Sequence, residues 1–449
     1  MGQLENREVK RENSQQVNGL KNKYSSMLLK SKNIILHGAP GTGKTYLARK
    51  IATDIITNGE FDDYTRLNDE QKKQIEFVQF HPSYDYSDFV EGLRPKINDD
   101  GSIGFELRDG IFMEFVERAR KNYENTKKTK DDIKKEIMAQ ELMEKFFSDI
   151  DFESTSFKTK KGNEFKITDN DDNKIYIYIP HNPSIKNITI DVEKVKRMLE
   201  SGKEFKQIKD VTQFFNDKVQ TQQHSYYFAI VKEIKERWEK EEKSRKLNKD
   251  INIEKLKKFI FIIDEINRGE ISKIFGELFF AIDPGYRGKA GEVSTQYANL
   301  HLNPNDKFYI PDNVYIIGTM NDIDRSVDSF DFAMRRRFRF IEVKANEHIE
   351  MLNSLKNEKI KKKAIERMES LNNAIVGVDG LNTNYQIGAA YFLKLNELTF
   401  EQLWTDCLKP LLEDYIQGMY DEEDIMKKLA EAYGYNELRK GNINEDTKG

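Results

Sequence analysis

The 449-residue sequence has little of what secreted, zinc-binding or membrane-spanning proteins need. Its one cysteine, Cys407, cannot form an internal disulfide, and with six scattered histidines it leaves no structural zinc site. No segment approaches the roughly 18 apolar residues of a transmembrane helix. The 73 basic and 77 acidic residues give a net charge of -4, so no overall positive field attracts nucleic acid. We therefore expect a soluble, cytoplasmic protein with no membrane partner, in which any DNA contact comes from a local patch.

What the sequence does contain is one diagnostic stretch near its start. An apolar run over residues 33–37 leads into Gly38, Ala39, Pro40, Gly41, Thr42, Gly43, Lys44 and Thr45, and Tyr46 continues into a helical pattern. This is GxxxxGK[ST] between a buried strand and a helix, the pattern of a phosphate-binding loop. The glycines let backbone N–H groups turn toward phosphates, Lys44 would reach the β- and γ-phosphates, and the Thr45 hydroxyl would hold Mg²⁺. We predict that GTP or ATP binds to residues 38–46.

Two further apolar runs end in side chains suited to hydrolysis. Residues 259–263 precede Asp264 and Glu265, and a strand over 313–320 precedes Asn321. Such runs are typical of strands buried on both faces of a parallel sheet, whose carboxyl ends bind ligands. Asp264 would hold Mg²⁺ through its water shell, Glu265 would orient or polarise the attacking water, and Asn321 would contact the γ-phosphate or that water. Taken alone, the Asp-Glu pair is explained equally well as a charged strand end, but beside a phosphate loop it indicates hydrolysis.

An arginine-rich segment follows the third apolar strand. It contains Arg335, Arg336, Arg337 and Arg339 within five positions. For any single one of them, a solvated surface position is the better interpretation. Arginine is nevertheless the side chain suited to neutralising charge on a transferring phosphoryl group. If a neighbouring subunit supplied it, hydrolysis would depend on assembly.

The pattern predicts an α/β protein with an interrupted core. Residues 1–120 and 257–345 would form a three-layer phosphate-loop core around a parallel sheet, and residues 346–449 a helical lid. Residues 121–256 differ from both flanking parts in composition and expected secondary structure, because highly charged helices there flank a strand-rich middle. A segment of this length is far beyond a normal connection, so we predict an inserted α+β module.

The inserted module has no clear function from sequence. Its two short helical patterns are compatible with a helix-turn-helix, although such pairs occur in many folds. Asp151 followed by Glu164 and Lys166 has the spacing of an Asp…Glu-x-Lys nuclease site that would bind Mg²⁺, a pattern that also arises by chance in so charged a chain. An interaction or DNA-recognition module is the simpler expectation.

Together these motifs resemble those of the AAA+ ATPases. Their residue sequences are similar to those of the McrB-type GTP-hydrolysing motors of modification-dependent restriction systems. The segments that carry the resemblance are residues 88–95, 264–269, 272–278, 318–321 with 324–326, 335–338 and 410–413. The resemblance implies that Asn321, Asp324 and Arg325 belong to the catalytic signature. It also implies a ring, commonly a hexamer, in which Arg336 or Arg337 acts across the subunit interface, with Arg268 and Arg325 as substitutes.

Three departures from the family pattern affect these expectations. Asp322 and Ile323 stand where the family usually has Thr and Ala, which puts the preference for GTP over ATP in doubt. In the lid, Ala389 and Ala390 replace a usual His-Ser pair and remove polar groups suited to sensing nucleotide. We also expect that the usual N-terminal DNA-reading domain is missing, so that its role passes to the insertion or to a partner.

The partners implied by the resemblance are DNA and a McrC-like nuclease, which the ring would stimulate during or after translocation. The same core is compatible with another class of protein. A MoxR-like or dynein-related ATPase would remodel a protein complex without touching DNA, and a slowly hydrolysing nucleotide-gated scaffold is a third possibility. Retention of Glu265 and Asn321 argues against the scaffold.

Overall fold

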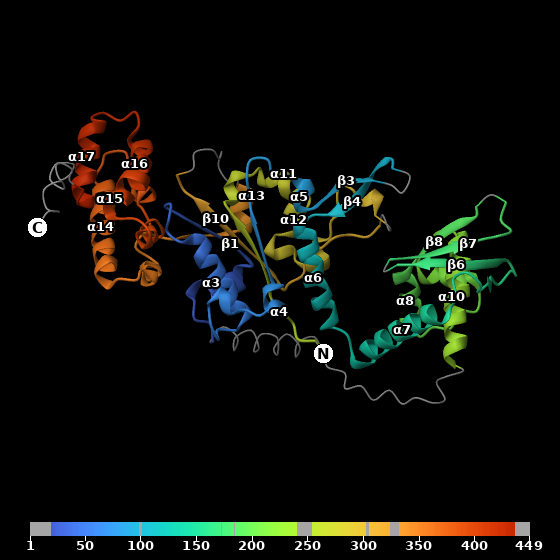
Figure 1. Cartoon of the computed structure of the whole chain (residues 1–449). Helices are drawn as coiled ribbons and strands as arrows, with labels where there is room; N and C mark the ends of the chain where they lie inside the picture. The colour runs from blue at the N-terminus through green and yellow to red at the C-terminus, as the bar shows by residue number, and fades with distance from the viewer. Residues whose placement is uncertain are drawn as a thin grey trace, which may run out of the picture. The chain divides into compact units, whose positions relative to one another are not determined.

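The computed structural model describes residues 19–97, 101–171, 173–183, 185–239, 254–301, 305–323 and 332–435. The chain divides into two compact units (Figure 1). The first combines residues 1–123 and 256–449, and the second consists of residues 124–255. Each unit is described by itself below.

A five-stranded sheet forms the centre of the first unit. Its strands are β1 (Asn33–Gly38), β2 (Ile75–Gln79), β9 (Phe259–Asp264), β10 (Val314–Asn321) and β11 (Arg339–Glu342). Their order is β11-β1-β10-β9-β2, and all four pairings are parallel. The sequence therefore correctly predicted a parallel α/β core. Because β1, β9 and β10 are neighbours, the polar residues at their carboxyl ends meet at one edge of the sheet.

Side chains of β9 alternate between two separate cores, which explains why this strand is apolar throughout. Phe261 and Ile263 pack with α6 (Ile111–Asn125), whereas Ile260 and Ile262 pack with α3 (Lys44–Ile56). Figure 1 shows α3 and α6 on opposite sides of the sheet. The sheet is thus the middle of three layers, and both of its faces are covered.

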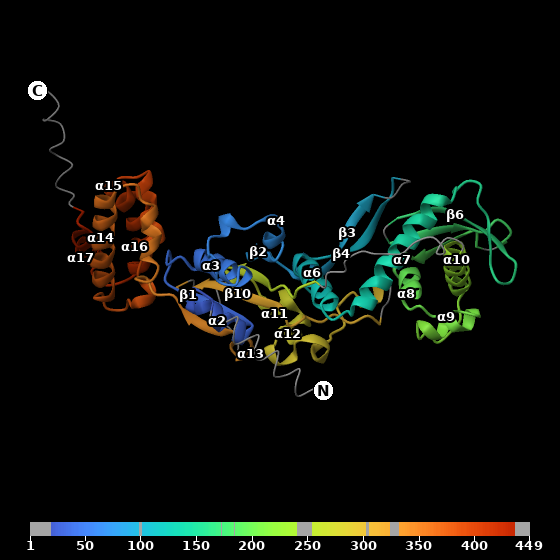
Figure 2. The same ribbon diagram turned by 90° about the horizontal axis from the view of Figure 1, so that it is seen from below.

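Short elements connect these layers. The helices are α2 (Lys23–Ser31), α4 (Asp69–Lys72), α5 (Tyr86–Phe89), α11 (Ile271–Phe275), α12 (Leu278–Ala281) and α13 (Phe332–Arg337). Single turns of 3₁₀-helix are η1 (Tyr64–Arg66), η3 (Ile266–Arg268), η4 (Pro284–Tyr286), η5 (Gly288–Gly291) and η6 (Ala298–Leu300). An antiparallel hairpin of β3 (Glu91–Ile97) and β4 (Ile103–Asp109) also belongs to this unit, and Figure 2 shows it extending from the body near α6.

The carboxyl-terminal part of the first unit is helical, as predicted for a lid. It comprises η7 (Ile349–Ser354), α14 (Glu358–Val376), η8 (Thr383–Tyr385), η9 (Ala389–Asn396), α15 (Phe400–Leu403), the π-helical turn η10 (Trp404–Leu408), α16 (Lys409–Ile416) and α17 (Glu422–Tyr433). Its separate core surrounds Trp404, whose ring stacks on Tyr433 at 5.0 Å between centroids.

The second unit is an α+β module. Its antiparallel sheet has the order β5 (Phe157–Lys158), β6 (Glu164–Asn170), β7 (Lys174–Tyr178) and β8 (Asn187–Asp191). The helices are α7 (Lys130–Asp149), α8 (Val192–Glu200), α9 (Ile208–Phe214) and α10 (Gln222–Glu239). Alternating strand residues such as Ile175 and Ile177 pack with α7, α8 and α10 in one core.

The helix-turn-helix interpretation of the inserted module does not match its geometry. Residues 201–207 separate α8 from the short α9, whereas a helix-turn-helix has a turn of 3–4 residues. The carboxylates of Asp151 and Glu164 accept hydrogen bonds from Ser154 and Ser156. Across the described ranges, no group of three Asp, Glu, His or Cys side chains is arranged to hold a metal ion.

Within the part of the chain that the structure describes, no helix combines the length and apolar character needed to cross a bilayer.

Candidate functional site

The candidate phosphate loop joins the carboxyl end of β1 to the amino end of α3. Gly41 and Gly43 have φ values of 73° and 82°, in the left-handed region where only glycine is comfortable. Gly43 is the N-cap of α3, so the unpaired N–H groups of the first helical turn face the loop. This arrangement gives the anion-binding end that the sequence pattern predicts.

Lys44 is the first residue of α3 and is only 7% exposed. Its ammonium group donates to the carbonyl oxygens of Gly38 at 3.1 Å and Ala39 at 2.8 Å. These contacts hold the amine of Lys44 at the phosphate loop, where a lysine of this motif binds the β- and γ-phosphates. Tyr46, by contrast, is 43% exposed on the outer side of the helix start, below the amine of Lys50.

A hydroxyl and a carboxylate meet beside the loop. Thr45 Oγ1 donates to Asp264 Oδ1 at 2.6 Å, and the hydroxyl of Thr319 donates to the same oxygen, also at 2.6 Å. Hydroxyl and carboxylate oxygens are the hard ligands that Mg²⁺ accepts, so Thr45 and Asp264 fit the ion expected with a nucleoside triphosphate. Thr319 was not predicted, although its place on β10 next to the end of β9 follows once the strand order is known.

Glu265 and Asn321 form a direct pair across the ends of β9 and β10. The Asn321 amide donates to Glu265 Oε1 at 2.8 Å, while Glu265 Oε2 lies 3.5 Å from Arg268 Nε. The backbone N–H of Glu265 donates to Thr319 Oγ1 at 3.2 Å, and its φ of 51° is unusual for a residue other than glycine. A left-handed backbone after the strand turns the carboxylate toward Asn321. The structure therefore brings together two residues that the sequence proposed for water activation.

Asp322, one of the departures from the family pattern, has a side-chain partner in the structure. His37 Nδ1 lies 3.0 Å from both carboxylate oxygens of Asp322, directly beside the carboxyl end of β1. The pair links β1 to the turn after β10. The polar residue at position 322 is thus accommodated by a histidine one position before the phosphate loop.

The two candidate arginines differ in accessibility. Arg337 is buried, donates to the carbonyl of Ala333 at 2.9 Å and lies 4.1 Å from the Phe279 ring centroid. Arg336 has a side chain that is 67% exposed and pairs with Asp283 at 3.2 Å. Asp324 and Arg325 lie outside the described residues.

A loop of the lid contacts the phosphate loop directly. The backbone N–H groups of Gly388 and Ala390 donate to the carbonyls of Pro40 at 3.0 Å and Gly41 at 2.9 Å. A Cβ at Gly388 would lie 2.2 Å from Gly41, so only glycine allows this approach. The lid therefore contacts the phosphate loop through its main chain, at the segment where Ala389 and Ala390 replace polar residues.

Asn372, on α14, fixes that lid loop. Its side chain donates to the carbonyl of Ile387 at 2.9 Å and accepts from the Ile387 N–H at 2.7 Å. It is 6% exposed, so both backbone groups of Ile387 are satisfied by a buried amide. This is a functional candidate that sequence analysis missed.

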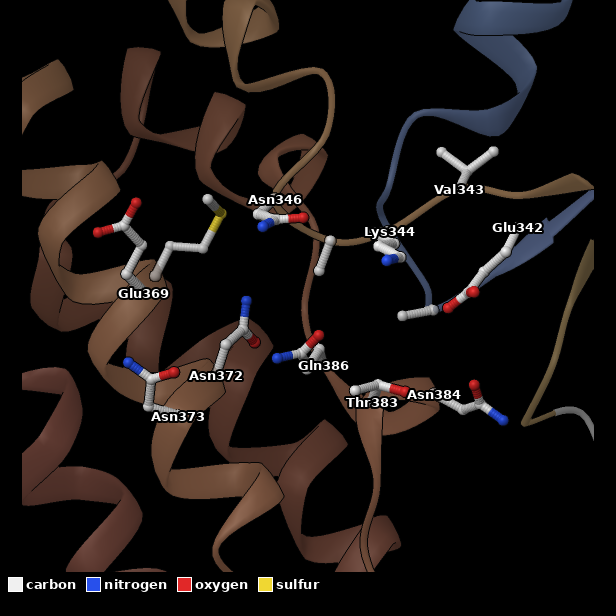
Figure 3. Close-up of a pocket in the computed structure, with 13 residues that line it drawn as sticks. Glu342, Val343, Lys344, Asn346, Glu369, Asn372, Asn373, Thr383, Asn384 and Gln386 are labelled. Carbon is white, nitrogen blue, oxygen red and sulfur yellow. The ribbon is translucent and has the colours of Figure 1, made fainter.

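A polar pocket of about 600 Å³ lies between the end of β11 and the lid (Figure 3). Its lining includes two carboxylates, Glu342 and Glu369, and several amides. The complete lining is Ala39, Glu342, Val343, Lys344, Ala345, Asn346, Met368, Glu369, Asn372, Asn373, Thr383, Asn384 and Gln386. Because Ala39 belongs to the phosphate loop, the pocket adjoins the site at which the phosphates would bind.

Comparison with known proteins finds both families expected from the motifs. Residues 363–424 match the family described as "McrB, alpha-helical lid domain", and residues 206–338 match "AAA domain (dynein-related subfamily)". The second match includes β9, β10 and α13, while the phosphate loop lies before it.

Two curated proteins are similar to the chain. The type IV methyl-directed restriction enzyme EcoKMcrB subunit of Escherichia coli (strain K12) is 26% identical over 417 residues, which cover 89% of this chain and 57% of that protein. The type II restriction enzyme BsuMI component YdiS of Bacillus subtilis (strain 168) is 32% identical over 88 residues, or 18% of this chain and 26% of that protein. The chain thus spans little more than half of the first relative and about a quarter of the second.

Proposed function

Because the chain is an McrB-like AAA+ protein, we propose that it hydrolyses a nucleoside triphosphate, assembles into a ring and drives a McrC-like nuclease on DNA in a restriction system. The observation that carries the proposal is the meeting of three groups at one sheet edge. These are the buried ammonium of Lys44, the Thr45–Asp264 pair and the Glu265–Asn321 pair.

The roles of the residues follow from their contacts. The amine of Lys44, which donates to the carbonyls of Gly38 and Ala39 in the phosphate loop, binds the β- and γ-phosphate oxygens. Glu265 accepts a proton from a water held in line with the γ-phosphate, and the Asn321 amide keeps its carboxylate aimed at that water. Thr45 and Asp264 would hold Mg²⁺, which when bound neutralises charge on the β- and γ-phosphates.

We propose GTP as the preferred substrate, with the base in the pocket between β11 and the lid. The base-pairing edge of guanine carries two kinds of N–H donor, and carboxylate oxygens accept hydrogen bonds from both. The same edge of adenine carries a donor beside an acceptor. Glu342 and Glu369 supply carboxylates to the pocket. Glu369→Gln should therefore lower kcat/KM for GTP more than for ATP. Glu366→Gln, which lies one helical turn away on α14 and outside the pocket lining, should change kcat/KM for neither nucleotide.

Ring assembly would supply the remaining catalytic group. We propose that Arg336, rather than Arg337, reaches the nucleotide of a neighbouring subunit, because its guanidinium is exposed while that of Arg337 is packed on Phe279. A repeated head-to-tail contact of this kind closes a ring when the rotation permits, commonly a hexamer in the family it resembles.

A second candidate function rests on the match of residues 206–338 to the dynein-related AAA subfamily. In that case the ring would remodel a protein complex and would have no DNA partner. The two candidates differ in whether DNA or a nuclease subunit changes the rate of nucleotide hydrolysis.

The deciding experiment measures hydrolysis of GTP and ATP by the purified chain, with and without DNA. Lys44→Ala should abolish turnover, whereas Lys50→Ala, on the same helix but outside the loop, should retain it. DNA-stimulated GTP hydrolysis would support the restriction motor. Turnover of ATP alone that DNA leaves unchanged would support the remodelling ATPase, and full turnover by Lys44→Ala would refute both.

A further inference from the structure

The second unit carries a lysine-rich surface that plays no part in the site described above. We call it the lysine surface, and it consists of Lys160, Lys161, Lys203, Lys206, Lys209 and Lys235. These residues come from the β5–β6 turn, the connection between α8 and α9, α9 itself and α10. All are exposed except Lys235, which is half-buried.

Hydrogen bonds to the main chain bring these segments together. The amine of Lys160 donates to the carbonyl of Lys206, and the amine of Lys235 donates to the carbonyl of Lys203 at 2.7 Å. Two lysines therefore hold the 201–207 connection in place from either side. The side chains of Lys203 and Lys206 extend from this fixed segment toward solvent.

Aromatic rings lie next to the amines of two of these lysines. Lys203 Nζ lies 5.3 Å from the Phe214 ring centroid, and Lys235 Nζ lies 5.7 Å from that of Phe205. The two rings pack edge to face at 5.4 Å. The two ammonium groups thus lie over partly buried rings, within the distance of a cation–π contact.

Two carboxylates, Asp210 and Glu204, lie beside the lysine surface. Asp210 accepts from the backbone N–H groups of Gln207 and Lys206, which lower the pKa of its carboxyl, as the nearby amine of Lys160 also does. Glu204 lies 3.8 Å from Lys206, and both side chains are about four-fifths exposed. Beside these two carboxylates the surface carries six lysines, in a chain that as a whole is slightly acidic. Clustered like charges repel, and an anionic ligand relieves that repulsion.

We propose that the lysine surface binds the phosphate backbone of double-stranded DNA without reading its sequence. Phosphates along a duplex match an extended set of point charges drawn from four segments. An acidic protein partner suits the surface less well, because the large apolar side chains exposed elsewhere on this unit, Ile185 and Val219, are not among its residues. The inference rests on the proposed function in taking DNA as the partner.

The test uses the full chain and a fluorescent 30-base-pair unmodified duplex, with anisotropy measured over a series of KCl concentrations. The variant Lys203→Gln/Lys206→Gln removes two charges whose amines make no hydrogen bond that holds the loop. The slope of log K against log salt is negative, and each lost phosphate contact lowers its magnitude by about 0.9. We expect this magnitude to fall by about 1.8 and the affinity at 0.1 M KCl to fall at least about tenfold.

The matched control is Lys174→Gln/Lys218→Gln, which removes the same charge from exposed positions of the same unit outside the lysine surface. It should bind DNA like the wild type. An equal loss of DNA affinity in both variants would show that only the net charge matters, and would overturn the proposal. No loss of affinity in either variant would also overturn it. A third outcome is that the Lys203→Gln/Lys206→Gln variant loses binding to fluorescent polyglutamate but not to DNA. That result would assign the surface to an acidic protein. Lys44→Ala separates the two proposals, because it should stop hydrolysis while leaving DNA affinity intact.

Discussion

Replacing Asn372 with alanine should loosen the lid loop that contacts the phosphate loop. The substitution removes one donor and one acceptor from the buried N–H and C=O of Ile387. Leaving one buried polar group unpaired costs about 1–3 kcal/mol. Because water entering the vacated space restores part of the loss, we expect a total destabilisation of the lid of about 2–4 kcal/mol.

The assay uses the fluorescence of Trp404, which is buried in the lid core. A Trp238→Phe background leaves Trp404 as the single tryptophan reporter. With a slope of about 2 kcal/mol per M, the urea midpoint should fall by roughly 1–2 M. The KM for the nucleoside triphosphate should rise as well, since the same loop supplies the Gly388 and Ala390 contacts to the phosphate loop.

Asn373 is the internal control. It follows Asn372 on α14 and also lines the pocket, but it is exposed and does not bond Ile387. Asn373→Ala should therefore change the free energy of unfolding by less than about 0.5 kcal/mol, as is usual for surface substitutions, which shifts the urea midpoint by less than about 0.25 M. Equal midpoints for the two alanine variants would refute the role assigned to Asn372.

Three further predictions address catalysis, assembly and pH. Glu265→Gln and Asn321→Ala should each lower kcat at least about tenfold while nucleotide binding, measured by isothermal titration, stays near the wild-type value; a large loss of binding would contradict the assignment. Arg336→Ala should abolish turnover, and mixing it with Lys44→Ala should restore activity if the arginine acts across subunits. Burial raises the pKa of Glu200, opposed by Lys196 and reinforced by Glu136, so ionisation of Glu200 at neutral pH weakens the folded state. Glu200→Gln should melt at a higher temperature than the wild type near pH 7, and the difference should vanish below about pH 4, where the unfolded carboxyl is protonated too.

The central sheet and the positions of its polar ends were predictable from sequence for a physical reason. Strands covered by helices on both faces must be apolar at every position, and the residues after Ile263 and Met320 are the first that reach the ligand edge. The phosphate loop is equally local, because Gly41 and Gly43 are required by backbone conformation.

Contacts between distant segments were not predictable in the same way. Thr319 reads as one more β-branched strand residue, and only the β9–β10 register places its hydroxyl on Asp264. Asp322 appeared as a departure from a family signature, whereas the structure pairs it with His37, 285 positions earlier. Neither pair leaves a trace in local spacing.

The lid loop shows most clearly what a motif comparison leaves out. The sequence indicated a loss of nucleotide sensing, because Ala389 and Ala390 carry no polar side chains. Yet the loop bonds Pro40 and Gly41 through its own N–H groups, and main-chain donors do not depend on side-chain identity. Since phosphates would bind to the same glycine-rich turn, any shift of Gly41 on binding must move or break the Ala390 bond. The lid can therefore respond to nucleotide through its backbone, with Gly388 as the residue whose missing side chain makes the contact possible.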